Sequence, residues 1–358
     1  MRSFVAALPF VVLTIVCWGN YGPLMHQGQH YMHDALHPFI GVGFAYFVIA
    51  VLAPSVMLKI SGERGHWSRE GALFSFISGA VGALGALGVI LAFTFQGKPM
   101  YVMPLVFGGA PIVNTIVTMW MAKSHTNISK KFLLGVLTAA IGAAGVLYFK
   151  PAPQATAPAA EHVAETAAAE VPEVVAAEAE TQLSLVALSV LMAIVCWGSY
   201  GPMLHKGQMK MGGSRLRPFL CVGAAYFLIA VALPLLILPM TTGLRDWSTP
   251  GMTEGWMWSL AGGAAGALGA LGIVLAFNFG GKPIFVMPLI FGLAPVMNTI
   301  TTVTGAGSWG RIGPEFIAAV LVTIAGAVSV LVFAPKPTAP PAKPVLASEP
   351  STTAAPSA

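Results

Sequence analysis

Charged side chains are scarce in this sequence. Of its 358 residues, 9% are charged and 56% are hydrophobic, and the mean hydropathy is +0.79. Soluble domains carry roughly 25% charged residues. A chain of this size with so few charges cannot cover a surface that faces water, so the composition predicts an integral membrane protein in contact with a lipid bilayer.

A basic face and a cysteine pattern are missing as well. The net charge is +5, but the 18 Lys and Arg are scattered singly between apolar runs, so we expect no nucleic-acid partner. Cys17, Cys196 and Cys221 lie in apolar segments without CxxC spacing. That arrangement supports neither a disulfide framework nor a zinc site, and we expect free thiols.

Ten apolar runs are about 20 residues long, the length that a helix needs to cross a bilayer. They predict an all-α integral membrane protein with ten transmembrane helices. The runs lie near residues 4–25, 37–59, 71–95, 100–121, 131–149, 183–204, 217–240, 255–279, 284–305 and 314–334.

The basic residues fall mainly on one side of these spans. With a cytoplasmic N-terminus, 14 Lys and Arg lie on the cytoplasmic side and 4 on the other side, where Lys98, Lys150, Arg245 and Arg311 are found. Cytoplasmic loops of membrane proteins are enriched in Lys and Arg. We therefore expect both termini in the cytoplasm, and the chain in a bacterial inner (plasma) membrane.

Two copies of a five-helix unit make up the chain. Residues 82–115, GALGALGVILAFTFQGKPMYVMPLVFGGAPIVNT, return as GALGALGIVLAFNFGGKPIFVMPLIFGLAPVMNT at 266–299, and CWGNYGP at 17–23 returns as CWGSYGP at 196–202. Because five is odd, the second copy enters the membrane from the opposite side. The predicted organisation is a repeat at 1–150, an acidic Ala/Pro/Glu-rich linker at 151–181, an inverted repeat at 182–334 and a disordered Pro/Ala-rich tail at 335–358.

The chain resembles the drug/metabolite transporter superfamily, specifically its EamA-like ten-helix members, in three features. These are five plus five helices, a Trp-Gly near the end of each first helix, and a proline in each fourth helix, Pro111 and Pro295. The resemblance covers about 300 residues. It implies a secondary transporter of small organic solutes. Amino acids, nucleosides and sugar-like metabolites all remain open as substrates.

The candidate substrate site combines helix breakers with mid-span polar residues. In both CWGxYGP motifs, two glycines and a proline are expected to interrupt a helix, and paired breaks in two halves are typical of transporter sites. Polar groups deep in the membrane need partners and are often functional. The expected substrate-binding residues are Trp18, Asn20, Tyr21, Asn114, Thr115, Trp197, Ser199, Tyr200, Asn298 and Thr299. Interface packing and interhelical hydrogen bonds are the alternative explanation.

Two further groups of residues have a functional and an ordinary explanation. Lys98 and Lys282 occupy equivalent short turns, where they either reach the headgroups or form a gate that attracts anions. His26, His30, His33 and His37 would share one face if helical and could then bind a metal or sense protons, but ordinary loop histidines are the favoured explanation, and no metal site or cofactor is predicted. Gly79, Gly82, Gly85 and Gly88, with Gly262, Gly266, Gly269 and Gly272, are expected to let helices approach closely.

Inside the ten spans the only Asp or Glu is Glu315, at the edge of the last run, so no acidic residue lies deep in a span. A bare ion would be uncompensated at that depth, so a neutral or zwitterionic small-molecule solute is expected. An enzyme is not predicted, because no nucleophile, acid/base pair or metal cluster is visible. A non-transporting membrane scaffold or sensor and a lipid-linked-sugar flippase remain as alternatives, and the oligomeric state, a homodimer included, is open.

Overall fold

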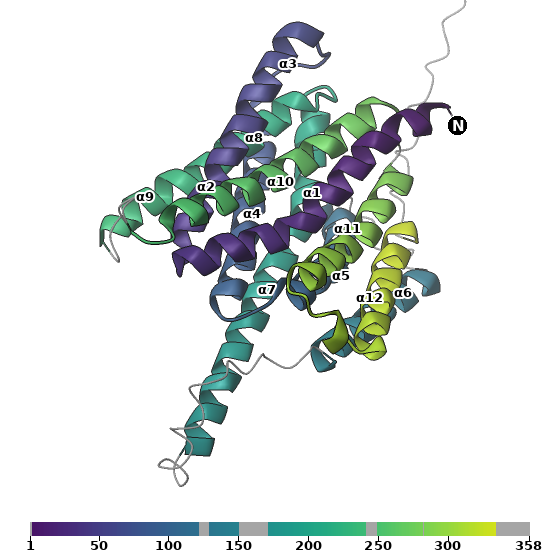
Figure 1. Ribbon diagram of the computed structural model, residues 1–358. Coiled ribbons are helices and arrows are strands. Elements are labelled where there is room, and N and C mark those ends of the chain that lie inside the picture. Colours follow the sequence, from purple (N-terminus) through teal and green to yellow (C-terminus); the bar gives the residue numbers. More distant parts are fainter. Residues whose placement is uncertain (1, 122–128, 150–170, 241–248, 282, 334–358) are drawn as a thin grey trace, which may run out of the picture.

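The computed structural model describes residues 2–121, 129–149, 171–240, 249–281 and 283–333, and these ranges contain helices and no strand (Figure 1). Short π-helical and 3-10 segments, named η, join some of the α-helices. In chain order the elements are α1 Arg2–Met32, α2 Leu36–Tyr46, η1 Phe47–Leu52, α3 Ala53–Ser61, α4 Arg69–Thr94, α5 Pro99–Met121, α6 Lys130–Tyr148, α7 Val171–Lys210, α8 Leu216–Phe227, η2 Leu228–Ala232, α9 Leu233–Ile237, η3 Leu238–Met240, α10 Met252–Asn278, α11 Pro283–Gly305, η4 Trp309–Arg311 and α12 Pro314–Val332.

In these described ranges, nine helical stretches are long and apolar enough to cross a membrane. The tenth predicted span corresponds to α11, Pro283–Gly305, which is 23 residues long. Leu134, Ile141 and Leu188 are 63%, 60% and 64% exposed, which suits a surface that faces lipid tails rather than water. The protein is an all-helical, multi-pass membrane protein.

Helices from the two sequence copies interleave. α1 of the first copy packs along α10 and α11, and α7 of the second copy packs along α4 and α5. In the same way α2 contacts α10, and α8 contacts α4, while α6 and α12 form a pair of their own (Figure 1). The buried core is therefore shared by both copies, and neither copy completes it alone.

The glycines of the third spans bring these helices close together, as the sequence predicts. A Cβ added to Gly79 of α4 would stand 2.7 Å from Cα of Val222 in α8. One added to Gly88 would stand 2.9 Å from the carbonyl oxygen of Ser189 in α7. Such distances leave no room for a side chain, so these positions require glycine.

The expected interruption of the first helices is wrong. α1 continues through Pro23 to Met32, and α7 continues through Pro202 to Lys210. Membrane helices tolerate a proline where neighbouring helices pack around the freed backbone group. The glycines of the motif serve that packing: a Cβ on Gly19 would lie 2.5 Å from Cβ of Met297, and one on Gly198 would lie 2.5 Å from Cβ of Val113.

The true irregularities lie in the second span of each copy. The N–H of Ala53 bonds to the carbonyl of Val48, and that of Leu233 to the carbonyl of Leu228, five residues earlier in both cases. Pro54 and Pro234 follow directly. A proline lacks the N–H of the regular ladder and clashes with the carbonyl four residues back, so a widened π turn before it relieves the clash.

The segment predicted as an acidic linker is helical in part. α7 begins at Val171, and its N-terminal part projects beyond the bundle (Figure 1). Residues 150–170 and the predicted tail at 335–358 lie outside the described residues.

Candidate functional site

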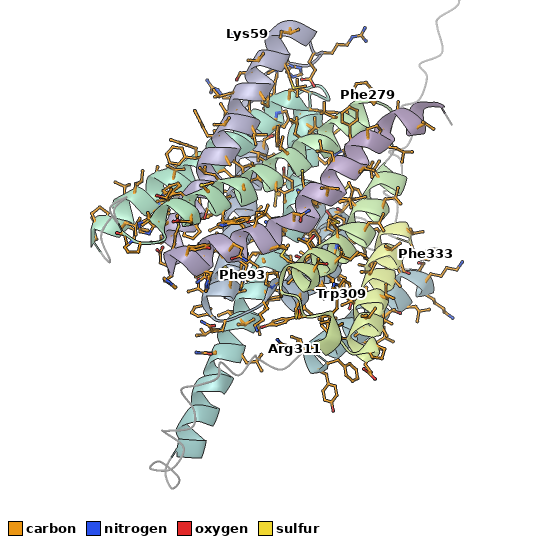
Figure 2. The ribbon with its side chains drawn as sticks, in the orientation of Figure 1. Lys59, Phe93, Phe279, Trp309, Arg311 and Phe333 are labelled. Atoms are coloured by element: carbon orange, nitrogen blue, oxygen red, sulfur yellow. The ribbon has the colours of Figure 1, made fainter. Side chains whose placement is uncertain are left out.

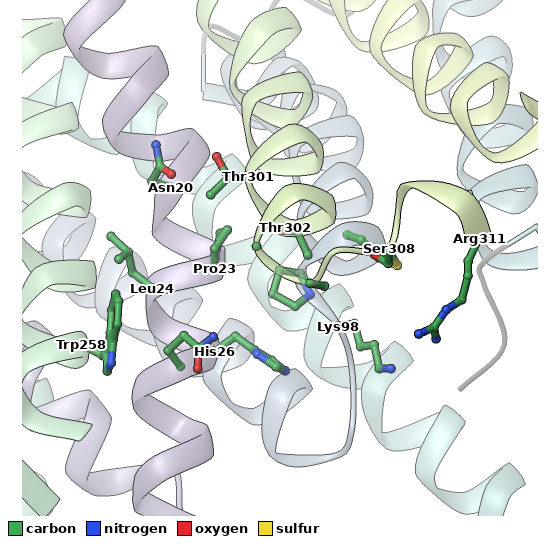
Figure 3. Close-up of a pocket in the computed structure, with 15 residues that line it drawn as sticks. Asn20, Pro23, Leu24, His26, Lys98, Trp258, Thr301, Thr302, Ser308 and Arg311 are labelled. Atoms are coloured by element: carbon green, nitrogen blue, oxygen red, sulfur yellow. The ribbon is translucent and has the colours of Figure 1, made fainter. Parts of the chain in front are cut away.

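A cavity of about 400 Å³ opens beside the C-terminal half of α1 (Figure 3). Its walls come from α1, the α4–α5 turn, the start of α5, the end of α11, the loop that follows α11, and one residue of α10. The lining residues are Asn20, Pro23, Leu24, His26, Gln27, Lys98, Pro99, Met100, Trp258, Thr301, Thr302, Gly305, Ala306, Ser308 and Arg311. This volume lies in the range of small-molecule sites.

The charge of this cavity is one-sided. Lys98 and Arg311 line it, and none of the lining residues is acidic. Neither cation forms an ion pair within 4 Å among the described residues, where the ion pairs involve other side chains. In Figure 3 both basic side chains extend to the same side of the cavity.

Two hydroxyl groups of the cavity wall have no hydrogen-bond partner in the described structure. They are Oγ1 of Thr302 and Oγ of Ser308, and both atoms are buried. A buried hydroxyl without a partner costs free energy, about 1–3 kcal/mol. Most hydroxyls elsewhere bond to a carbonyl one helical turn back, as Thr299 does to Pro295 at 3.0 Å. Both oxygens are closed to solvent in this conformation, so a ligand in the cavity would bond to them after these side chains turn toward it.

Of the ten predicted substrate-binding residues, Asn20 lines this cavity. Its Nδ2 donates to the carbonyl of Val16 at 2.7 Å, which leaves its side-chain oxygen free to accept a bond. Ser199, at the equivalent position of the second copy, donates to the carbonyl of Val195 at 2.8 Å. Thr115 and Thr299 also donate to carbonyls of their own helices.

The two tryptophans dock on glycines of the other copy. Nε1 of Trp18 donates to the carbonyl of Gly266 at 3.1 Å, and Nε1 of Trp197 donates to the carbonyl of Gly82 at 3.0 Å. A Cβ added to Gly269 would overlap the Trp18 indole. The same holds for Gly85 and the Trp197 indole. These indoles have structural partners, and neither lines the cavity.

Four tyrosines gather between the copies. The rings of Tyr46 and Tyr226 stack with centroids 3.7 Å apart and 1° between their planes. Tyr21 is buried, and its ring lies 5.7 Å from that of Trp197. A Cβ on Gly82 would stand 3.1 Å from the Tyr226 hydroxyl oxygen, and 3.2 Å from Cδ2 of Tyr200. This aromatic centre lies behind the cavity wall rather than in it.

Both mid-span asparagines pack against the other copy, and Asn298 also supports the cavity wall. Asn298 is fully buried, and its Nδ2 donates to the carbonyl of Pro99, a cavity-lining residue, at 2.9 Å. Its side-chain oxygen has no partner among the described residues and lies next to Gly22. Asn114 lies next to Gly201 in the same way. Each asparagine thus faces a motif glycine of the other copy.

The lysines and histidines separate in the structure. Lys98 lies in the cavity wall, whereas Lys282 lies outside the described residues. The four histidines do not share one helical face, because α1 ends at Met32 and the chain turns at His33 with φ +54°. Of these histidines, His26 lines the cavity, His30 precedes the turn, and Nδ1 of His37 lies 2.8 Å from Oδ2 of Asp34. In the described ranges no group of three or more His, Cys, Asp or Glu could hold a metal ion.

At the opposite end of α4, polar contacts join the two copies. The carboxylate of Glu63, in the α3–α4 turn, accepts bonds from Ser214 Oγ at 2.7 Å and from the N–H groups of Arg215 and Leu216 at 2.9 and 3.4 Å. It also lies 3.6 Å from Nη1 of Arg217. We call these five residues the Glu63 network.

Glu63 does for the start of α8 what Asp34 does for the start of α2. In the first copy Asp34 accepts from the N–H groups of Leu36 and His37, at the start of α2. Alignment of the Pro-Phe pairs at 38–39 and 218–219 puts Ser214 at the position of Asp34, and Arg217 at that of His37. The second copy therefore takes the carboxylate that caps its helix from the first copy.

The cavity and the Glu63 network lie at opposite ends of α4. Glu63 precedes Arg69, the first residue of this helix, and Lys98 follows Thr94, its last residue. A helix of 26 residues is about 39 Å long. Lys59, close to the network, and Arg311 lie correspondingly far apart in Figure 2.

Sequence reasoning missed most of the cavity. Thr301 and Thr302 follow Asn298 by one helical turn, a polar run that could have been noticed. Ser308 and Arg311 lie between α11 and α12, Arg311 at the end of η4, and no span-based pattern connects this segment to the site.

No protein-family model and no curated protein match this chain. The resemblance to the drug/metabolite transporter superfamily therefore stays a prediction from the motifs.

Proposed function

We propose that the chain is a secondary transporter of a small polar organic solute, such as an amino-acid, nucleoside or sugar-like metabolite, working by alternating access. The observation that carries this proposal is the cavity beside α1 and α11, together with the Glu63 network at the other end of α4, a helix about 39 Å long. A membrane scaffold or sensor would need neither a polar cavity among apolar spans nor a closed opposite end.

The repeated sequence supports an inverted arrangement of the two halves. The contacts of Trp18 with Gly266 and of Trp197 with Gly82 correspond between the copies, as do the π turns before Pro54 and Pro234. Inverted repeats are typical of secondary transporters, in which two halves move around a shared site. The EamA-like resemblance points the same way.

The charge distribution supports an orientation for this arrangement. Lys98 and Arg311 are two of the four basic residues that the charge count assigns to the non-cytoplasmic side, and both line the cavity. Glu63 and Arg217 belong to loops assigned to the cytoplasm. The described conformation is then open to the outside and closed to the cytoplasm, with both termini cytoplasmic.

Transport is tested with the purified protein in liposomes. Vesicles preloaded with unlabelled leucine, uridine, glucose or lactate should accumulate the labelled form of at least one of them, and Asn298→Leu should slow this exchange about tenfold or more. The variant loses the bond that holds Pro99 in the cavity wall, and one such bond is worth about 1.4 kcal/mol.

Thr138→Val is the matched control, because this hydroxyl bonds within α6 on an exposed face and should not affect exchange. Folding of each variant is checked by size-exclusion chromatography. Folded wild-type protein that exchanges neither these four solutes nor glycerol 3-phosphate, or an Asn298→Leu variant that exchanges a substrate at the wild-type rate, would contradict the proposal.

A further inference from the structure

One end of the cavity gathers two cations and two free hydroxyls. Lys98 comes from the α4–α5 turn, Thr302 from α11, and Ser308 and Arg311 from the loop after α11. In the view of Figure 3, Thr302, Ser308 and Lys98 lie on the same side of the cavity as the Arg311 guanidinium. Both copies contribute, since Lys98 belongs to the first and the other three residues to the second.

We propose that the transported solute is a small organic anion, whose carboxylate or phosphate is bound by Lys98, Arg311, Thr302 and Ser308. This inference rests on the proposed transport function and adds the chemical class of the solute. It differs from the neutral or zwitterionic solute expected from the sequence, because that expectation considered charges inside the spans and not at their ends.

The hydroxyl groups favour an anion over other ligands. Oγ1 of Thr302 and Oγ of Ser308 are buried and have no partner in the described structure. Each hydroxyl carries one O–H, which can donate to an anionic oxygen. Hydrogen bonds with one charged partner are shorter and stronger than neutral ones, and the planar guanidinium of Arg311 can donate two parallel hydrogen bonds to a carboxylate or a phosphate.

The charges disfavour the other classes of solute. A cation would face Lys98 and Arg311 with no acidic residue in the lining to compensate it. The ammonium group of a zwitterion meets the same obstacle. A neutral solute could bond to the hydroxyls and accept hydrogen bonds from Lys98 and Arg311, but it would lack the charge that strengthens those bonds. The apolar part of an anion finds Leu24, Met100 and Trp258 on the remaining wall.

Matched pairs of probes test this inference. Labelled lactate is compared with lactamide, and glycerol 3-phosphate with glycerol, so each pair differs mainly by the anionic group. Exchange is measured in phosphatidylcholine liposomes, and binding to the purified protein by equilibrium dialysis. We expect at least one anion to bind and exchange about tenfold faster or more than its neutral partner.

Lys98→Gln combined with Arg311→Gln should remove this preference. Both side chains are exposed and form no ion pair among the described residues, so the double variant should fold. Thr302→Val combined with Ser308→Ala should weaken anion binding without changing the charge. Lys59→Gln combined with Arg69→Gln removes two exposed positive charges outside the cavity and should behave as wild type.

The outcomes separate the two proposals. Equal exchange of anions and their neutral partners, unaffected by the Lys98/Arg311 variant, would overturn the anion site and leave transport standing. Anion binding that depends on Lys98 and Arg311 but without exchange would overturn transport and leave the site. Absence of both would overturn both. Displacement of the bound anion by added phosphatidylglycerol would assign the site to a lipid headgroup and overturn the soluble solute.

Discussion

Replacing Glu63 by alanine should open the end of the protein that lies opposite the cavity. The carboxylate holds the start of α8 by accepting from Ser214, Arg215 and Leu216, and it lies beside the guanidinium of Arg217. Its removal leaves these donors without their acceptor, at a cost of about 2–3 kcal/mol to the closed form. If these contacts are absent in the other conformation, the open population rises roughly thirtyfold.

A cysteine at Met211 reports this opening. Met211 is fully buried next to the network. The cysteine is placed in a background in which Cys17, Cys196 and Cys221 are serine. N-ethylmaleimide should label this thiol tenfold faster or more in Glu63→Ala than in the parent. This factor is roughly what the loss of one charged hydrogen bond to the closed form would produce.

Glu70→Gln is the control for Glu63→Ala. Glu70 pairs with Lys210 at 3.0 Å in the same region, but both side chains are about half exposed, and such pairs contribute about 0–1 kcal/mol. Its labelling rate should stay near that of the parent. Glu63→Gln keeps an acceptor without the charge and should give an intermediate rate. Equal rates in Glu63→Ala and its parent would contradict the gating role.

Placing a methyl group on Gly85 should destabilise the protein strongly. The added Cβ would overlap the Trp197 indole, which is held by its bond to the carbonyl of Gly82. Overpacking costs about 1–3 kcal/mol, and loss of the indole bond adds about 1 kcal/mol. Gly85→Ala should therefore lower the midpoint of thermal unfolding in detergent by several degrees, and Gly269→Ala should act alike against Trp18.

Gly310→Ala is the matched control, because no atom lies within 4 Å of a Cβ at that position. Combination of Gly85→Ala with Trp197→Leu should cost less than the sum of the two single changes, because the smaller side chain makes room for the methyl group. Additive losses in this double-mutant cycle would show that the two positions do not share the space.

The sequence predicted the helices better than their ends. Spans are long apolar runs, so hydropathy finds them, but α1 and α7 extend past Pro23 and Pro202 because neighbouring helices pack around both prolines. π turns precede Pro54 and Pro234 but not Pro23 and Pro202. Nothing in the local sequence around these four prolines predicts that difference. The difference depends on which helices cross there: Gly223 contacts Ala50, and Gly43 contacts Ala230.

The site was predicted less well, for a related reason. Polar residues inside spans attract attention, yet Trp18, Trp197 and Asn298 find their partners on neighbouring helices. The residues with unsatisfied groups at the cavity, Thr302 and Ser308, lie at a helix end and in a loop. Their proximity to Lys98 depends on α5 and α11 crossing, which tertiary contacts reveal and sequence spacing does not.

Two-sided labelling of one cavity residue tests the alternating-access account most directly. A cysteine replaces Thr301 in the cavity wall of the cysteine-free background, and an impermeant thiol reagent is applied to right-side-out and to inside-out membrane vesicles. With Glu63 intact, labelling should occur from the outside and not from the inside, whereas Glu63→Ala should make the same cysteine reactive from the inside. The account would be contradicted if this cysteine were labelled only from the inside while Glu63 is intact. It would also be contradicted if labelling from the two sides were equal both with Glu63 and with Glu63→Ala.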